Sequence, residues 1–139
     1  MINNSVITSI KGVICMFGLP NQSKPIGRMN LYLTQNSFIL EKNKTQYSIP
    51  YNKIFSFQVL KGLGDMRSAI INSNIYETVL EITYISETGS TSIMRIEIAT
   101  YFSVIRNYGE MKNLLLKMHE NHIFDKFIKP DGTLYVDNH

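Results

Sequence analysis

The chain has one cysteine, no tryptophan and no long apolar run. A single cysteine excludes the internal disulfide framework of small secreted domains, and we expect Cys15 to be a buried strand residue. The most apolar stretch near the N-terminus, Gly12–Leu19, is far shorter than the roughly 18 residues of a membrane-spanning helix. Met1–Ser5 carries no basic residue of the kind that opens a secretory signal. We therefore expect a cytoplasmic protein.

Sequence signatures of catalysis are equally scarce. The chain contains no G-x-S-x-G nucleophile motif, and Arg67 stands where a third glycine would complete a dinucleotide fingerprint begun by Gly62–Gly64. His119, His122 and Asp125 could be drawn as a metal site, but no further ligand completes the set. Cations are also common at the end of a helix because they interact favourably with its dipole. We therefore expect a protein that is not an enzyme and binds no cofactor or metal.

The composition that is present indicates one globular, β-rich domain. Hydrophobic residues make up 44% of the 139 residues and charged residues 18%, with eight tyrosines and seven phenylalanines. Aromatic residues favour strands, and a chain of this length buries roughly two thirds of its unfolded surface in a single core. We predict a single domain over residues 1–139 with its core at about 6–121. The extension 122–139 is too apolar for a free tail, so it is expected to fold back or contact a partner.

Met29–Lys61 is the stretch around which the chain is organised, because it alternates like four short strands. The alternating apolar residues are Met29, Leu31 and Leu33, then Phe38 and Leu40, then Tyr47 and Ile49, then Phe55, Phe57 and Val59. Gln35-Asn36 and Lys42-Asn43-Lys44 predict tight turns, since Asn tolerates a positive φ. Pro50 ends the third of these strands because it has no N–H to donate.

Strands are also expected on both sides of this stretch. Val6–Phe17 predicts one strand with a bulge near Gly12. Residues 76–86 and 91–99 predict a hairpin in which Ile82 lies opposite Ile96 and Glu81 opposite Glu97. The conformation of 62–75 is ambiguous, with a turn at 62–65 as one interpretation.

A helix is predicted from Tyr101 to about Asn121, capped by Thr100. Its apolar stripe consists of Ile105, Tyr108, Met111, Leu115 and Met118, widened by Val104 and Leu114. Such a stripe either packs over the end of the sheet or is presented to a partner, and both interpretations remain open.

Two motifs in the central stretch resemble a known family. Leu31-Tyr32-Leu33-Thr34 and Ile49-Pro50-Tyr51-Asn52-Lys53-Ile54, in this order and separated by F-I-L-E and a polar loop, are similar to GRAM and bacterial pleckstrin-homology-like (PH-like) domains. The resemblance covers roughly residues 6–121. It implies a mainly β fold, a strongly bent seven-stranded antiparallel barrel capped at one end by a C-terminal α-helix. Both motifs mark the fold, so function has to come from a site.

The charge distribution gives the main candidate site. Residues 1–70 hold eight lysines and arginines against two acidic residues, whereas residues 71–139 hold six against nine. In the fold that the resemblance implies, the loops after the first and third strands lie at one end, which places Lys24, Arg28, Lys42 and Lys44 together. The cluster either solvates the surface or binds an anion, a lipid headgroup or an acidic peptide. Residues 24–30 lack the paired basic residues of phosphoinositide-binding members, and the absence of a basic helix disfavours nucleic acid.

These observations favour a non-enzymatic binding module. Its expected partner is a protein or peptide, held in a groove between the fifth strand and the helix or along a sheet edge. The alternative is a peripheral membrane module that binds anionic lipid headgroups through the four basic residues. Self-association into a homo-oligomer is a third hypothesis.

Overall fold

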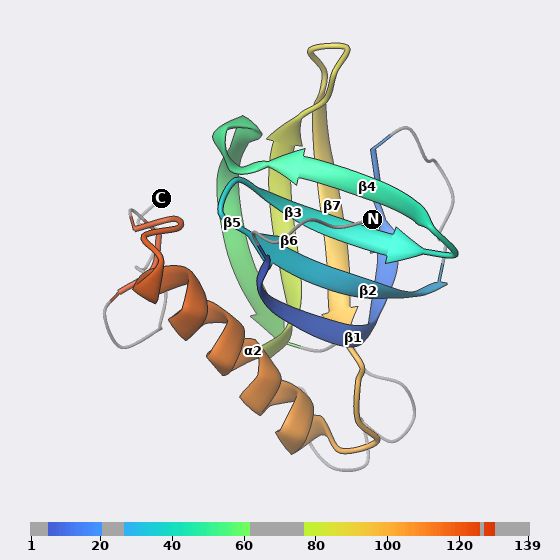
Figure 1. Ribbon diagram of the computed structural model, residues 1–139, viewed down its shortest axis with the longest axis vertical. Coiled ribbons are helices and arrows are strands. Elements are labelled where there is room, and N and C mark those ends of the chain that lie inside the picture. Colours follow the sequence, from blue (N-terminus) through green and yellow to red (C-terminus); the bar gives the residue numbers. More distant parts are fainter. Residues whose placement is uncertain (1–5, 21–26, 62–76, 126, 130–139) are drawn as a thin grey trace.

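The computed structural model describes residues 6–20, 27–61, 77–125 and 127–129 (Figure 1). They form seven strands, a short 3₁₀ turn and one α-helix. The elements are β1 (Val6–Phe17), β2 (Gly27–Thr34), β3 (Ser37–Lys42), β4 (Thr45–Pro50), η1 (Tyr51–Lys53), β5 (Ile54–Lys61), β6 (Glu77–Ile85), β7 (Thr91–Ile98) and α2 (Val104–Glu120). The strands make one antiparallel sheet in the order β4-β3-β2-β1-β7-β6-β5. The prediction of a mainly β fold with a C-terminal helix is confirmed, and the sheet is not closed, since β4 and β5 are its two edges.

The sheet is bent so that β2, β3 and β4 cross in front of β5, β6 and β7 (Figure 1). β1 belongs to both halves, because it pairs with β2 along most of its length and with β7 from Val13 to Phe17. Its register shifts between Lys11 and Val13, and Gly12 there has a φ of 80°. This is the predicted bulge, and a bulge bends its strand.

The core fills the inside of the bend and is closed by α2. The largest fully buried side chains of the core are each less than 2% exposed. They are Phe38, Leu31, Leu33, Leu40, Ile49, Leu80, Ile82, Met94, Ile96, Ile98, Met111 and Leu114. α2 runs along one end of the sheet and contacts β1, β6 and β7 (Figure 1). Met111, Leu114, Leu115 and Met118 are buried, so this part of the helical stripe packs on the sheet. Ile105, predicted for the same stripe, is instead 60% exposed.

The helix begins later than predicted. Its N-cap is Ser103, whose side chain accepts a hydrogen bond from the Arg106 N–H at 3.3 Å. Thr100 instead donates its hydroxyl to the Lys11 carbonyl and so anchors the chain to β1 before the helix starts. The side chain of Asn107 bonds both the N–H and the carbonyl of Tyr101, at 2.9 and 3.0 Å. These bonds hold Tyr101 outside the helix.

The hairpin of β6 and β7 differs from the predicted register by two residues. Ile82 lies opposite Met94, and Glu81 lies opposite Arg95 instead of Glu97. Arg95 donates two hydrogen bonds to the Glu81 carboxylate. The observed register replaces two like charges with an ion pair, which is favourable across strands. It requires a five-residue connection, closed by the Ser86 N–H on the Ser90 carbonyl at 2.8 Å.

Two further predictions for the central stretch, Met29–Lys61, were wrong. The β2–β3 turn lies at Gln35-Asn36 as predicted, but Asn36 does not adopt a positive φ. The hydroxyl of Thr34 forms the turn by accepting the N–H groups of Asn36 and Ser37, at 3.3 and 3.0 Å. A register shift between Ile54 and Ser56 makes Phe55 half exposed while Phe57 is buried, so these two residues do not share a face.

The residues after α2 return to the domain. Ile123 and Ile128 are buried in the core. The ring of Phe124 lies among those of Phe57, Tyr51, Phe127 and Phe38, with centroid distances of 5.0, 5.2, 5.8 and 6.0 Å. The first part of the extension therefore packs on its own chain. Residues 130–139 lie outside the described residues, as do the expected turn at 62–65 and the ambiguous segment that follows it.

Replacing Phe124 by alanine should show how strongly this return stabilises the domain. We expect Phe124→Ala to lower the free energy of unfolding by about 2–3 kcal/mol, because it removes a partly buried ring that contacts four others. Phe102→Ala is the matched control, since Phe102 is 85% exposed and its truncation should change stability by less than about 0.5 kcal/mol. Urea unfolding of both variants measures the difference. An equal loss of stability in the two variants would show that the packing of Phe124 does not stabilise the domain.

Candidate functional site

Three of the four basic residues proposed from the sequence lie at one end of the sheet. Arg28 is the second residue of β2, Lys42 is the last residue of β3, and Lys44 belongs to the turn that joins β3 to β4. Figure 1 shows the start of β2 and the β3–β4 turn on the same side of the molecule. Lys24 lies outside the described residues.

Arg28 and Lys42 line the same pocket, whose volume is about 520 Å³. Its lining residues are Lys11, Gly12, Arg28, Met29, Asn30, Glu41, Lys42, Asn43 and Thr100. They come from β1, β2, β3, the β3–β4 turn and, in the case of Thr100, the segment after β7. Nζ of Lys42 lies 3.7 Å from the position that a Cβ on Gly27 would take, which places this ammonium group at the start of β2. We call this cavity the basic pocket.

Lys11 is a third cation of the basic pocket that sequence reasoning missed. It lies on β1, where it pairs with Asn30 across the β1–β2 ladder. The separation of 17 residues from Arg28 gave no local signal. In the sequence, only Gly12 pointed to Lys11, because a glycine can mark a bulge and a bulge changes the direction of the neighbouring side chain.

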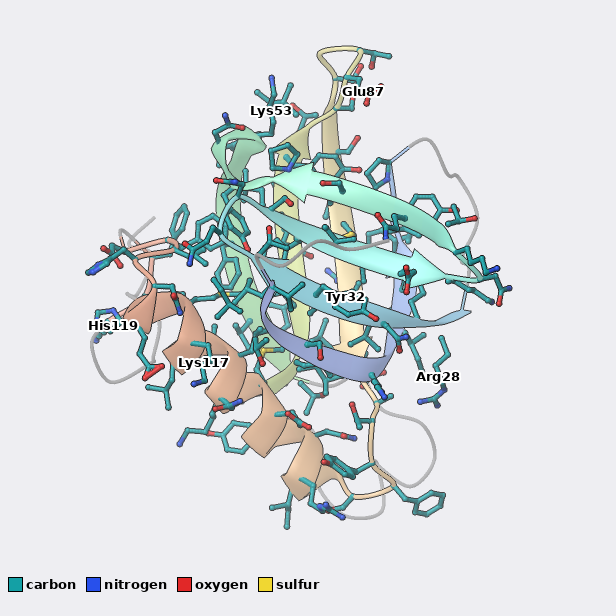
Figure 2. The ribbon with its side chains drawn as sticks, in the orientation of Figure 1. Arg28, Tyr32, Lys53, Glu87, Lys117 and His119 are labelled. Carbon is teal, nitrogen blue, oxygen red and sulfur yellow. The ribbon has the colours of Figure 1, made fainter. Side chains whose placement is uncertain are left out.

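The guanidinium group of Arg28 is held by backbone carbonyl groups. Nη1 donates to the Ala99 carbonyl at 2.7 Å and to the Gly12 carbonyl at 3.3 Å. These bonds join β2 to the bulge of β1 and to the end of β7. Figure 2 shows Arg28 beside the segment that connects β7 to α2. The charge of Arg28 is therefore fixed at the pocket wall.

Among the described residues, Glu41 is the one carboxylate that lines the basic pocket. It accepts hydrogen bonds from the Tyr32 hydroxyl at 3.5 Å and from the Gln46 amide at 3.1 Å. Tyr32 lies on the outer side of β2 (Figure 2). Three cations against one carboxylate leave the described part of the lining positive, so the pocket favours an anionic ligand.

Lys44 lies next to the pocket in a strained turn. Asn43 and Lys44 have φ angles of 52° and 70°, and Lys42 pairs with Thr45 across the turn. Two consecutive positive φ angles define a type I′ turn, whose second position favours glycine. A lysine in the left-handed region costs about 1–2 kcal/mol. The chain thus keeps a positive charge at a position where the backbone favours glycine.

The potential nucleophile, Cys15, and the potential metal ligands do not line the basic pocket. Cys15 is 1% exposed, its thiol donates to the Phe17 carbonyl at 3.6 Å, and burial raises its pKa, which disfavours a reactive thiolate. His122 Nδ1 lies 3.1 Å from Asp125 Oδ2 on the surface. Among the described residues, no three histidine, cysteine or acidic side chains are grouped to hold a metal ion.

A second surface feature lies on the outer side of β1, β5, β6 and β7. Four large apolar residues there are between 39% and 49% exposed, and we call them the outer stripe: Phe17, Phe55, Ile85 and Ile93. Ile93 pairs with Thr83 and Ile85 with Thr91, so the two isoleucines share one face. The guanidinium of Arg95 lies 5.4 Å from the Phe17 ring centroid. Sequence reasoning placed Phe55 on the same face as Phe57, and the register shift on β5 exposes it instead.

Sequence comparison adds no relative. No family model matches the chain, and no curated protein matches it in sequence. In the part of the chain that the structure describes, no helix is both long and apolar enough to cross a membrane.

The strain at Lys44 predicts opposite effects for the same substitution at two positions. Lys44→Gly should raise the free energy of unfolding by up to about 1 kcal/mol, because glycine adopts the left-handed region freely. Lys53→Gly should lower it by roughly 0.5–1 kcal/mol, because Lys53 lies in the 3₁₀ turn η1 at an ordinary φ. Thermal unfolding of both variants at equal salt checks this. A loss of stability in Lys44→Gly would show that the left-handed conformation of Lys44 does not destabilise the protein.

Proposed function

We propose that this protein is a non-enzymatic binding module of the PH-like superfamily that attaches to an anionic membrane surface by holding a lipid headgroup in the basic pocket. The bent sheet of seven antiparallel strands and the single helix that packs on its end support the PH-like assignment. A cytoplasmic location is part of the proposal, because the inner leaflet supplies anionic lipid.

The observation that carries the proposal is the meeting of three cations from three strands in one cavity. Lys11, Arg28 and Lys42 all line the basic pocket. Its volume of about 520 Å³ lies within the usual range for small-ligand sites. Because Arg28 is already fixed by its bonds to Ala99 and Gly12, less conformational entropy is lost when a ligand binds.

The position of Lys44 supports the same interpretation. A lysine at the tip of a type I′ turn extends the positive surface beyond the pocket. Local strain of this kind is found where function requires the residue. Each Lys or Arg close to an anionic leaflet contributes about 1 kcal/mol to attachment. Lys44 thus destabilises the folded protein and strengthens its attachment to the membrane surface.

The ligand we propose is a headgroup of low charge, such as phosphatidylserine or phosphatidylglycerol. The lining combines three cations with Glu41, so it balances a small negative charge better than a polyphosphate. The stretch 24–30 also lacks the paired basic residues that phosphoinositide-binding members share. Both observations disfavour a phosphoinositide.

Reversing two pocket charges tests the proposal. Lys11→Glu/Lys42→Glu should weaken binding to vesicles with about 30% anionic lipid at least tenfold, since each reversal removes one attraction and adds one repulsion. Arg28 is left intact because its bonds support the fold. Wild-type binding should weaken as salt rises, because salt screens exposed charges. Vesicle sedimentation at several salt concentrations measures both effects.

The matched control is Lys53→Glu/Lys117→Glu. It makes the same change in net charge, and Figure 2 shows both lysines on the side of the molecule away from Arg28. This control should retain most of the wild-type binding. No sedimentation of the wild-type protein with anionic vesicles, or an equal loss in the control, would reject the membrane proposal.

A second candidate function, protein binding, is favoured by the outer stripe. Exposed apolar residues that cluster on one face often mark a protein interface. The expected groove beside β5 is a poorer site, because Phe124 and Phe127 already pack on Phe57 there. A protein partner, or a second copy of the chain, would therefore cover the outer stripe and leave the basic pocket open.

Affinity capture with two single variants tests this second function. Ile93→Glu places a charge in the centre of the outer stripe and should abolish recovery of a specific partner. Leu116→Glu is the control, since Leu116 is similarly exposed, at 39%, but lies on α2. A protein recovered by the wild type and by Leu116→Glu, but lost with Ile93→Glu, would support the interface. Identical recovery by all three baits would refute it, and light scattering shows whether the partner is the chain itself.

A further inference from the structure

We propose that the segment between β7 and α2 inserts into the anionic bilayer, with Phe102 and Ile105 entering the interface between headgroups and acyl chains. This inference rests on the proposed function, because the basic pocket supplies the headgroup contact beside the inserted residues. Phe102 is 85% exposed and Ile105 is 60% exposed, the two highest values among the large apolar side chains of the described residues. Aromatic and aliphatic side chains of this kind anchor proteins at membrane interfaces.

Phe102 lies close to the basic pocket in the chain. Thr100 lines the pocket, and Phe102 follows two residues later, so their Cα atoms are within about 7 Å of each other. Ile105 belongs to the first turn of α2. A headgroup held in the pocket therefore places the acyl region of its lipid within reach of Phe102.

The backbone that presents Phe102 is held in place on both sides. The Ala99 N–H donates to the Gly12 carbonyl at 3.1 Å, and Arg28 donates to the Ala99 carbonyl at 2.7 Å. On the other side the side chain of Asn107 bonds both backbone groups of Tyr101. The exposure of Phe102 is thus imposed by a hydrogen-bonded segment, and insertion requires little rearrangement of the backbone.

Charge complementarity identifies an anionic bilayer as the occupant. The first turn of α2 carries no acidic residue, and the N-terminus of a helix attracts negative charge. The guanidinium of Arg106 lies 3.8 Å from the Tyr101 ring centroid, beside the exposed pair. With Lys11, Arg28 and Lys42 in the adjacent pocket, the apolar tip is flanked by cations. A surface that is negative outside and apolar beneath matches this arrangement.

Tryptophan fluorescence can locate Phe102 directly, because the chain contains no tryptophan. In Phe102→Trp the single tryptophan should shift its emission to shorter wavelength with phosphatidylcholine vesicles containing about 30% phosphatidylserine. It should also be quenched by lipids brominated in the acyl chains. Phe55→Trp is the control, since Phe55 is half exposed in the outer stripe, and its emission should not change. Phe102→Ser/Ile105→Ser should bind these vesicles roughly tenfold more weakly and keep the wild-type unfolding curve.

The outcomes separate the two proposals. Sedimentation of Phe102→Trp with the vesicles, without a shift or quenching, would overturn insertion and leave the headgroup site standing. Failure of the wild type to sediment with them would overturn both. A shift that appears without vesicles and grows with protein concentration would mean that a second copy covers Phe102, which also overturns insertion.

Discussion

The bend of β1 at Gly12 is the constraint on which the basic pocket depends. Because β1 pairs with β2 on one side and β7 on the other, its bulge brings the start of β2 against the end of β7. The guanidinium of Arg28 then reaches the carbonyl groups of both Gly12 and Ala99. A side chain at Gly12 would meet Arg28 Nη1 at 3.0 Å and the Thr100 backbone at 3.3 Å. The absence of a side chain there allows the three strands to meet.

The sequence predicted those features that depend on local periodicity. Alternation identified the strands between Met29 and Lys61, and helical spacing identified the buried face of α2, because one periodic pattern suffices for each. Features that depend on pairing were missed or misplaced. The bulge at Phe55 reverses one strand face, and the hairpin of β6 and β7 follows the Glu81–Arg95 pair. Lys11 could be assigned to the candidate site only from the β1–β2 pairing, which determines its neighbours.

Polar and aromatic contacts away from the pocket keep the surrounding frame rigid. The Tyr51 hydroxyl donates to the Thr34 carbonyl at 2.6 Å, and the Tyr84 hydroxyl donates to the Gly18 carbonyl at 2.7 Å. Burial raises the pKa of both phenols, so both remain protonated donors near neutral pH. Tyr51 also contacts Phe38 and Phe124. These contacts stabilise the core at positions away from the pocket that Lys11, Arg28 and Lys42 line.

The two exposed apolar surfaces lie at opposite ends of β7, which makes the functions proposed for them compatible. Ile93 stands near the start of β7, and the segment leading to Phe102 begins after its last residue, Ile98. At about 3.3 Å per residue, the six steps from Ile93 to Ala99 span roughly 20 Å. Arg28 and Glu87, which mark the pocket end and the hairpin end, are likewise well separated in Figure 2. A bilayer bound at Phe102 would therefore leave the outer stripe accessible, so a module attached to the membrane could still recruit a protein.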